Sequence, residues 1–333
     1  MKAFEWASPT SLDQAVKLLA EVTPEEDNDA ARPMSGGQDL LTTMKERILV
    51  PKRVVNLKMI QGLSGIADDG KGGLNIGAVT KLVEIESDPR IVKNFPVLAQ
   101  AAESIATVQL RNQGTIGGNL CQRPRCLYFR LPHIVCLKKG GDTCYSEHGQ
   151  NKYNAILGGG PSFIVHPSDL ATALSALDAT ITITGPKGTR EVAIGNFFTL
   201  PSDNAAVENV LDDAEIVSMI HIPASAFAAR SGYVKFKERS SLDFAMVAAA
   251  AAVEVGPDQM VRQARLVLGA VAPIPWRVPK AEAMLVGKPL SDDTIRAAAE
   301  IALDGAAPLE HNAYKIPLAK TLLRRAIDKA KSA

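Results

Sequence analysis

Two Gly-Gly turns, about 80 residues apart, each follow a segment with an extended or buried pattern. The first is SGGQDL, residues 35–40, and the second is TIGGN, residues 115–119. Paired glycines let backbone N–H groups point into a common space without Cβ obstruction, and a helix start adds a field that favours an anion. Neither turn has the spacing of a Rossmann or P-loop motif. The pair therefore favours a dinucleotide held between two small domains, and the alternative is two unrelated loops.

All four cysteines lie directly after the second turn, at Cys121, Cys126, Cys136 and Cys144. A long chain without an export signal is not typical of disulfide-stapled secreted domains. Zinc usually prefers paired C-x2-C ligands, which are absent here, so the irregular spacing fits an iron–sulfur cluster at least as well. Zinc, and a disulfide with two free thiols, are the alternatives. Basic residues that would offset anionic thiolates are Arg123, Arg125, Arg130, Lys138 and Lys139.

Length and charge limit the class of protein. A chain of 333 residues can bury two or three cores and hold a large cofactor. The net charge is +1, with Lys and Arg scattered among Asp and Glu, so nucleic acid is not an expected partner. The N-terminus lacks the apolar segment of a signal peptide, and no window reaches the ~18 apolar residues of a membrane span. We therefore expect a chain with no membrane span, located in the cytoplasm.

Hydrophobic periodicity predicts an α/β unit over residues 1–57 and a second α/β unit over 58–224. The first contains a helix at SLDQAVKLLAEV, with Leu12, Ala15, Val16 and Leu19 on one face, and a buried strand at RVVNLKMI. The second contains a strand at GGLNIGAVTKLVEI, a helix at PVLAQAAESIATVQL and a strand–helix–strand pattern across SFIVHPSDLATALSALDATITITGP. In the last pattern Ser168 is the expected N-cap and Asp169 begins the helix, while His166 is expected to be a packed histidine.

Residues 230–333 have a different pattern. We expect successive antiparallel strands at YVKFKERSS, FAMVAAAAAVEV and VRQARLVLGAVAPIPWRV. Helices are expected at SDDTIRAAAEIALDGA and YKIPLAKTLLRRAIDKAKSA. A separate C-terminal domain is therefore predicted.

Taken together, these motifs resemble the FAD-binding medium subunits of the molybdenum hydroxylases, the xanthine dehydrogenase and carbon monoxide dehydrogenase family. The similarity is greatest to the branch found in bacterial aldehyde oxidoreductases of the periplasmic type. It covers essentially the whole chain, through MKAFEWASPTSLDQAVKLL, SGGQDLL, LRNQGTIGGNL, HPSDLATALSALDA and YVKFKERSSLDFAMVAAAAAV. The resemblance implies an α+β fold of the vanillyl-alcohol-oxidase (PCMH) type, with two α/β subdomains holding extended FAD and a C-terminal domain of antiparallel sheet and helices.

The resemblance also implies positions for the cofactor. The two turns would wrap the pyrophosphate through the backbone of Ser35, Gly36, Gly37, Gln38, Asp39 and Leu40, and of Thr115, Gly117, Gly118 and Asn119. Asp169 and Lys235 would line the flavin, where the lysine charge would favour the anionic reduced form. Because a carboxylate so close to phosphate is unfavourable, the Asp39 side chain is expected to turn away and cap backbone. No residue set for carbon hydroxylation is found, so no catalytic residue is assigned.

The cysteine loop resembles an insertion, at about residues 122–160, that carries a [4Fe–4S] cluster in the aldehyde oxidoreductase branch. Cys126, Cys136 and Cys144 match three of its ligands. At the position of the fourth ligand this chain has Ser162. Either Cys121 completes the set, or three cysteines hold the cluster with the Ser162 oxygen, water or nothing as the last ligand. The number of iron atoms stays open.

The resemblance implies an electron-transfer subunit. A large partner subunit would hold the molybdenum cofactor, a small one would hold two [2Fe–2S] clusters, and electrons would pass through FAD to an external acceptor. One alternative is a self-contained flavin dehydrogenase or reductase on the same fold, and another is a zinc-bound scaffold. A partner with an export signal could carry the complex to the periplasm.

Overall fold

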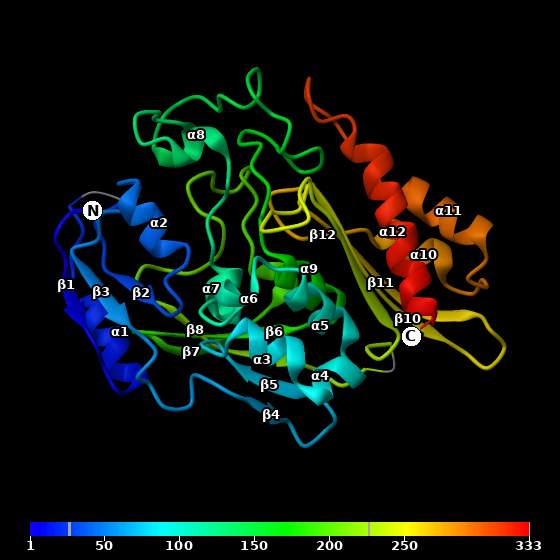
Figure 1. The fold of residues 1–333 in the computed structure, drawn as a ribbon, viewed down its shortest axis with the longest axis horizontal. Coiled ribbons are helices and arrows are strands. Elements are labelled where there is room, and N and C mark those ends of the chain that lie inside the picture. Colours follow the sequence, from blue (N-terminus) through cyan, green and yellow to red (C-terminus); the bar gives the residue numbers. More distant parts are fainter. Residues whose placement is uncertain (26–27, 226, 333) are drawn as a thin grey trace.

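A computed structural model describes residues 1–25, 28–225 and 227–332, and its three sheets divide the chain into three regions (Figure 1). The first sheet is parallel and has the order β1-β3-β2. Its strands are β1 (Glu5–Ala7), β2 (Arg32–Met34) and β3 (Arg53–Asn56). Its helices are α1 (Leu12–Ala20) and α2 (Leu40–Lys45). Helix α1 buries Ala15, Val16 and Leu19, as its periodicity predicted, because these residues recur on one face.

The second sheet is antiparallel and has the order β4-β5-β8-β6-β7. Its strands are β4 (Ile66–Asp68), β5 (Leu74–Gly77), β6 (Thr180–Gly185), β7 (Gly188–Ala193) and β8 (Ile216–Ile222). The helices of this region are α3 (Leu82–Ser87), α4 (Pro89–Asn94), α5 (Pro96–Glu103), α6 (Val108–Arg111), α7 (Ile116–Leu120) and α9 (Asp169–Ala176), with the 3-10 turn η2 (Ile194–Asn196).

Four predictions for this region were wrong in detail. The strand expected over residues 72–85 is limited to β5, and its last residues, from Leu82, begin helix α3. The helix expected over residues 96–110 is broken into α5 and α6, because the chain turns at Ala106, which has a positive φ of 50°. The TIGGN segment is the first turn of helix α7, capped by the Thr115 side chain. Residues 162–166 form no strand, since their backbone groups pair with a loop and a turn: Phe163 accepts from Ala155, and His166 donates to Ala272.

The third sheet is antiparallel and has the order β12-β11-β10-β9. Its strands are β9 (Ser231–Phe236), β10 (Val247–Val255), β11 (Val261–Gly269) and β12 (Trp276–Arg277). The helices are α10 (Pro279–Leu285), which was not predicted, α11 (Asp292–Ile301) and α12 (Lys315–Ser332). Ala333, the last residue of the predicted C-terminal helix, lies outside the described residues.

The alanine run in β10 reflects burial of this strand on both faces. Ala248 and Ala250 belong to the core that contains α5, α9 and the second sheet, whereas Ala249 and Ala251 face the core formed with α12. Successive residues of a strand point to opposite faces, so both sets need short side chains where helices pack closely. Figure 1 shows the result, with α5 and α9 between the two larger sheets and α12 on the outside.

The insertion of about residues 122–160 contains only α8 (Leu127–Arg130) and the 3-10 turn η1 (Leu137–Lys139). It lies beside α2, above the second sheet in the view of Figure 1. Its end is fixed by Lys315, which is fully buried and donates to the carbonyls of Tyr153, Asn154 and Ala270 at 2.9, 2.9 and 2.8 Å. Among the described residues, no helix combines the length and apolar character needed to cross a membrane.

Candidate cofactor-binding site

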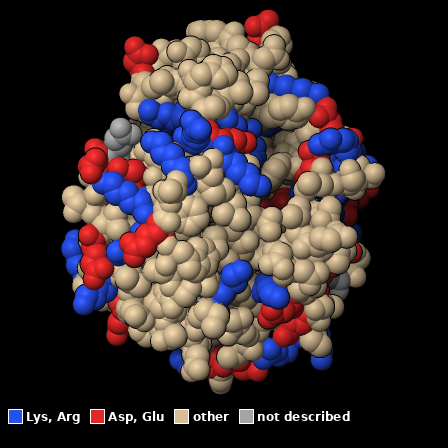
Figure 2. Space-filling view, turned by 60° about the vertical axis from the view of Figure 1, so that its left-hand side comes forward, with Lys and Arg blue, Asp and Glu red and all other residues tan. Residues whose placement is uncertain are grey.

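A cleft of about 1190 Å³ lies where the first two regions, the insertion and the connection between β9 and β10 meet. Ligand pockets typically measure about 300–1,000 Å³, so the cleft has room for an unusually large ligand. Figure 2 shows Lys and Arg side chains gathered around a hollow on this side of the molecule. Basic residues that line the cleft are Arg32, Arg47, Arg123, Arg125, Lys138, Lys139 and Lys235.

The two glycine turns lie against each other at the floor of this cleft. The Ser35 and Thr115 hydroxyls are 2.7 Å apart. A Cβ placed on Gly36 would lie 2.2 Å from the Gln113 carbonyl oxygen, so the two backbones approach as only glycine permits. Gly37 has a φ of +72°, a conformation that glycine adopts at little cost. The sequence predicted a site between two small domains, and the structure brings the two turns together there.

The predicted turn residues do not all face the cleft. All six residues Ser35–Leu40 line it, as do Thr115, Gly118 and Asn119. Gly117 is buried behind them, and its missing Cβ leaves room for Ala78, which a Cβ would approach to 2.9 Å. The Asn119 amide oxygen accepts from the Ser168 hydroxyl at 2.6 Å and so links the second turn to the N-terminus of α9.

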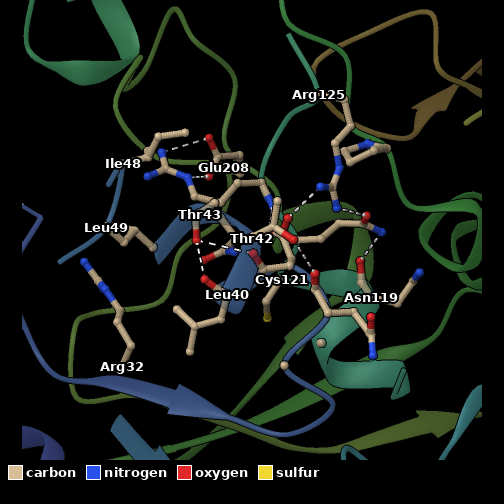
Figure 3. A pocket seen from close by; sticks show the side chains of 18 of the residues that line it. Arg32, Leu40, Thr42, Thr43, Ile48, Leu49, Asn119, Cys121, Arg125 and Glu208 are labelled. Carbon is tan, nitrogen blue, oxygen red and sulfur yellow. Dashed lines mark hydrogen bonds and ion pairs between the residues drawn. The ribbon is translucent and has the colours of Figure 1, made fainter. Parts of the chain in front are cut away.

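Asp39 turns its carboxylate toward the insertion. It accepts from the backbone N–H of Arg123 at 2.8 Å and pairs with the guanidinium groups of Arg125 and Arg130 at 2.8 and 2.9 Å. This agrees with the expectation that the side chain caps backbone. The first glycine turn is thereby fixed to the start of the insertion. Figure 3 shows Arg125 entering the cavity from the side opposite to Asn119 and Cys121.

A second carboxylate, Glu208, holds the insertion at the cleft wall. It is buried and pairs with Arg123 and Lys138 at 2.9 and 2.8 Å. Burial by itself raises the pKa of Glu208, but attraction to the two cations holds it below its ordinary value. The guanidinium groups of Arg123 and Arg130 lie over the Phe129 ring, at 4.7 and 5.6 Å from its centre. Sequence reasoning did not identify Glu208, because only the fold brings it beside the insertion.

Asp169 and Lys235 also line the cleft, where they form a buried ion pair. The lysine Nζ lies 2.8 Å from one carboxylate oxygen, and the two side chains are 4% and 6% exposed. Lys235 also donates to the Ser104 carbonyl at 3.2 Å, and Tyr233 donates its hydroxyl to the other Asp169 oxygen. Tyr233 was not predicted. The available signal was its position two residues before Lys235, on the same face of a strand.

His166 and Ser168 organise the N-terminus of α9. The Ser168 hydroxyl accepts from Ala171 N–H at 2.9 Å, so the predicted N-cap is confirmed. The His166 ring packs edge-on against Phe198 with centres 4.6 Å apart, and Nδ1 accepts from the Ser168 N–H. Burial lowers the pKa of His166 to about 4. The structure therefore places it as a neutral, packed histidine.

The four cysteines, all free thiols, fall into two groups. Cys121 lines the large cleft, and burial raises the pKa of its thiol to about 12. Cys126, Cys136 and Cys144 line a separate cavity of about 10 Å³ together with Ser162. Burial also raises the pKa of Cys126. Within the described residues, no group of three or more His, Cys, Asp or Glu side chains is arranged to hold a metal ion.

The fold and the cleft define a flavoprotein of two parts, and sequence comparison agrees. Residues 2–225 match the model described as FAD binding domain in molybdopterin dehydrogenase, and residues 232–330 match the CO dehydrogenase flavoprotein C-terminal domain. The chain belongs to the family of FAD-binding subunits of the molybdenum hydroxylases.

Its relatives share nearly their whole length with it. It is 32% identical to the aldehyde oxidoreductase FAD-binding subunit PaoB of Escherichia coli (strain K12), over 100% of this chain and 99% of the relative. It is 29% identical to the carbon monoxide dehydrogenase medium chain of Hydrogenophaga pseudoflava, over 98% and 96%. Among solved structures, CO dehydrogenase from Oligotropha carboxidovorans superposes with a TM-score of 0.77 at 26% identity, covering 99% of this chain and 98% of that one.

Proposed function

We propose that this chain is the FAD-holding electron-transfer subunit of a molybdenum-dependent dehydrogenase of the aldehyde or xanthine type. The observation that carries the proposal is the contact between the two glycine turns inside one large cleft that the Asp169–Lys235 pair also lines. The named relatives, subunits of aldehyde oxidoreductase and CO dehydrogenase, support the same role. FAD, when bound, supplies the exchange between single-electron and two-electron transfer.

The residues of the cleft fit such a cofactor. The space that a Cβ on Gly36 would occupy is taken by the backbone just before the second turn, so the N–H groups of the first turn can face a pyrophosphate held between the two. In the second turn the N–H groups of Gly117 and Asn119 already donate to the carbonyls of Ala78 and Thr115, so this turn contributes close approach and not free donors. Gly118 and Asn119 line the same part of the cleft. Lys235 lines the same cleft, where its positive charge favours the anionic reduced flavin.

The partners in this proposal are a large subunit with the molybdenum cofactor and a small subunit with [2Fe–2S] clusters. The large subunit oxidises the organic substrate, the small one delivers electrons to this chain, and an external acceptor receives them. We place the complex in the cytoplasm, or in the periplasm if a partner subunit carries an export signal.

We also propose that the insertion binds a [4Fe–4S] cluster. Support comes from the donor set, since Cys126, Cys136 and Cys144 line one cavity and thiolates are the usual ligands of such clusters. The cavity of about 10 Å³ has room for about one water, so the insertion must widen to admit the cluster. Ser162 lines the same cavity, whereas Cys121 lines the FAD cleft. Ser162 is therefore the better placed of the two candidates for the fourth position.

Both proposals are tested on the anaerobically purified full-length chain, in which FAD, iron, sulfide and zinc are measured on one sample. We expect one FAD per chain and about 4 iron atoms per FAD. Cys144→Ala should lose the iron and keep the flavin, while the control Cys121→Ala should keep the iron. Flavin without iron would refute the proposal that the insertion binds a cluster. Zinc without flavin would refute both proposals.

A second assay separates a complex subunit from a self-contained enzyme. The isolated chain and the assembled complex are compared for oxidation of aldehydes and of NADH with an artificial acceptor. Aldehyde oxidation only by the complex supports the proposal. Organic-substrate turnover by the isolated flavin-loaded chain would instead establish a self-contained dehydrogenase.

A further inference from the structure

Three side chains, those of Asp169, Tyr233 and Lys235, form a connected group at the wall of the cleft. The Asp169 carboxylate uses both oxygens: Oδ1 accepts from the Tyr233 hydroxyl and Oδ2 accepts from Lys235 Nζ at 2.8 Å. Asp169 and Lys235 line the cleft, whereas Tyr233 lies behind them and is 3% exposed. Tyr233 therefore reaches the cleft only through Asp169.

The hydrogen bonds of Lys235 leave part of its capacity free. An ammonium group carries three N–H donors. One is donated to Asp169 and one to the Ser104 carbonyl at 3.2 Å. The third is available to a group bound in the cleft, which Lys235 lines.

The charge of Lys235 is offset by the carboxylate beside it. If Lys235 were the only partner of the Asp169 carboxylate, the negative charge of the carboxylate would offset much of the positive potential of the ammonium in the cleft. A hydroxyl donated to the other oxygen stabilises the charged carboxylate and draws part of its charge away from the lysine. Burial and the nearby Asp169 raise the pKa of Tyr233 well above its usual range, so the hydroxyl keeps its proton.

The backbone of Tyr233 is held in place from three sides, which fixes where its hydroxyl lies. Its backbone lies in β9, where it pairs with Ala250 of β10. Its N–H donates to the Gln100 side chain of α5 at 2.8 Å, and its carbonyl accepts from Lys329 of α12 at 3.4 Å. A group fixed in this way is a preorganised support for the residues that face a ligand.

We propose that Tyr233 is a positioning residue that, through Asp169, keeps the Lys235 ammonium effective toward the ring of bound FAD. This inference rests on the proposed function, since it requires flavin in the cleft. Removing the hydroxyl leaves Asp169 Oδ1 without this donor. The negative charge of the carboxylate then offsets more of the positive charge of Lys235. The site then becomes less positive, and the anionic reduced flavin is less favoured.

The test is Tyr233→Phe in the assembled, FAD-loaded complex, because the ring is kept and only the hydroxyl is lost. We expect the midpoint potential of the flavin to shift downward while the FAD content stays the same. The control Tyr314→Phe removes a hydroxyl that donates to the Lys152 carbonyl on the surface, and should leave the potential unchanged. An unchanged potential in Tyr233→Phe would overturn the inference.

A double-mutant cycle distinguishes an effect of Tyr233→Phe that passes through Lys235 from a general disturbance of the folded structure. In a Lys235→Met background the hydroxyl has no ammonium to act on, so adding Tyr233→Phe should give no further shift. A shift of equal size in both backgrounds would show that Tyr233 does not act through Lys235. Absence of flavin from the wild-type complex would refute the proposed function itself, an outcome distinct from either result with the variants.

Discussion

Gly36→Ala tests the contact on which the cofactor cleft depends. The added Cβ would lie 2.2 Å from the Gln113 carbonyl oxygen and 3.0 Å from the Gly114 Cα, whereas ordinary van der Waals contact begins at 3.4 Å. The two turns must therefore separate by about 1.2 Å along this contact (3.4 minus 2.2). The obstacle is backbone, which cannot rotate away as a flexible side chain can. Overpacking of this kind costs about 1–3 kcal/mol.

That cost falls on the bound state, because the turns must keep their spacing to surround the ligand. At about 1.4 kcal/mol per tenfold change, FAD should bind about 5- to 150-fold more weakly to the variant. Titration of the flavin-free full-length chain with FAD, followed by flavin fluorescence, measures the loss. Gly195→Ala is the matched control, since its Cβ would meet open space, and it should bind FAD like the wild type. Equal affinity of the two variants would refute the idea that the turns must touch.

The remaining predictions concern stability. Asp39→Asn should lower the free energy of unfolding by about 1–3 kcal/mol in denaturant titration, because Arg125 loses a part-buried carboxylate partner. Asp258→Asn, at an exposed pair, should change the free energy of unfolding much less, and equal losses in the two variants would contradict this ranking. His166 has a folded pKa of about 4 against an ordinary 6.5, so the unfolded chain binds more protons between these values and stability falls as the pH is lowered through them. The full loss is about 3 kcal/mol, and His166→Gln should show a flatter pH dependence in thermal unfolding between pH 6.5 and 4.

The features predicted well are those with local causes. Ser168 caps α9 because a serine side chain at that position bonds an N–H three residues later, and this needs only the neighbouring backbone. Gly37 takes a positive φ that glycine adopts at little cost, so the position of the first turn could be predicted from the local sequence. The strands expected in the C-terminal region are likewise confirmed as β9, β10 and β11, because a run of apolar and β-branched residues can be recognised within a few positions.

The features predicted poorly depend on which distant segments meet. The break at Ala106 and the short helix at TIGGN follow from packing against other elements, which override local propensity. Tyr233 is marked only by its place two residues before Lys235, and nothing near Glu208 marks it, because their partners lie 64 and 85 residues away. Such contacts require the whole fold before the residues can be compared.

The sequence by itself determined the two glycine turns, the N-cap of α9, the clustered cysteines and the order of strands in the C-terminal region. Only the tertiary structure decided that Gly36 touches Gln113, that Asp39 faces the insertion, and that Cys121 is separated from the other three cysteines. The physical reason is the separation along the chain of the residues that interact. Turns, caps and strand periods are set by steric and hydrogen-bonding limits within a few residues, while a site is set by the path that brings remote backbone segments into contact.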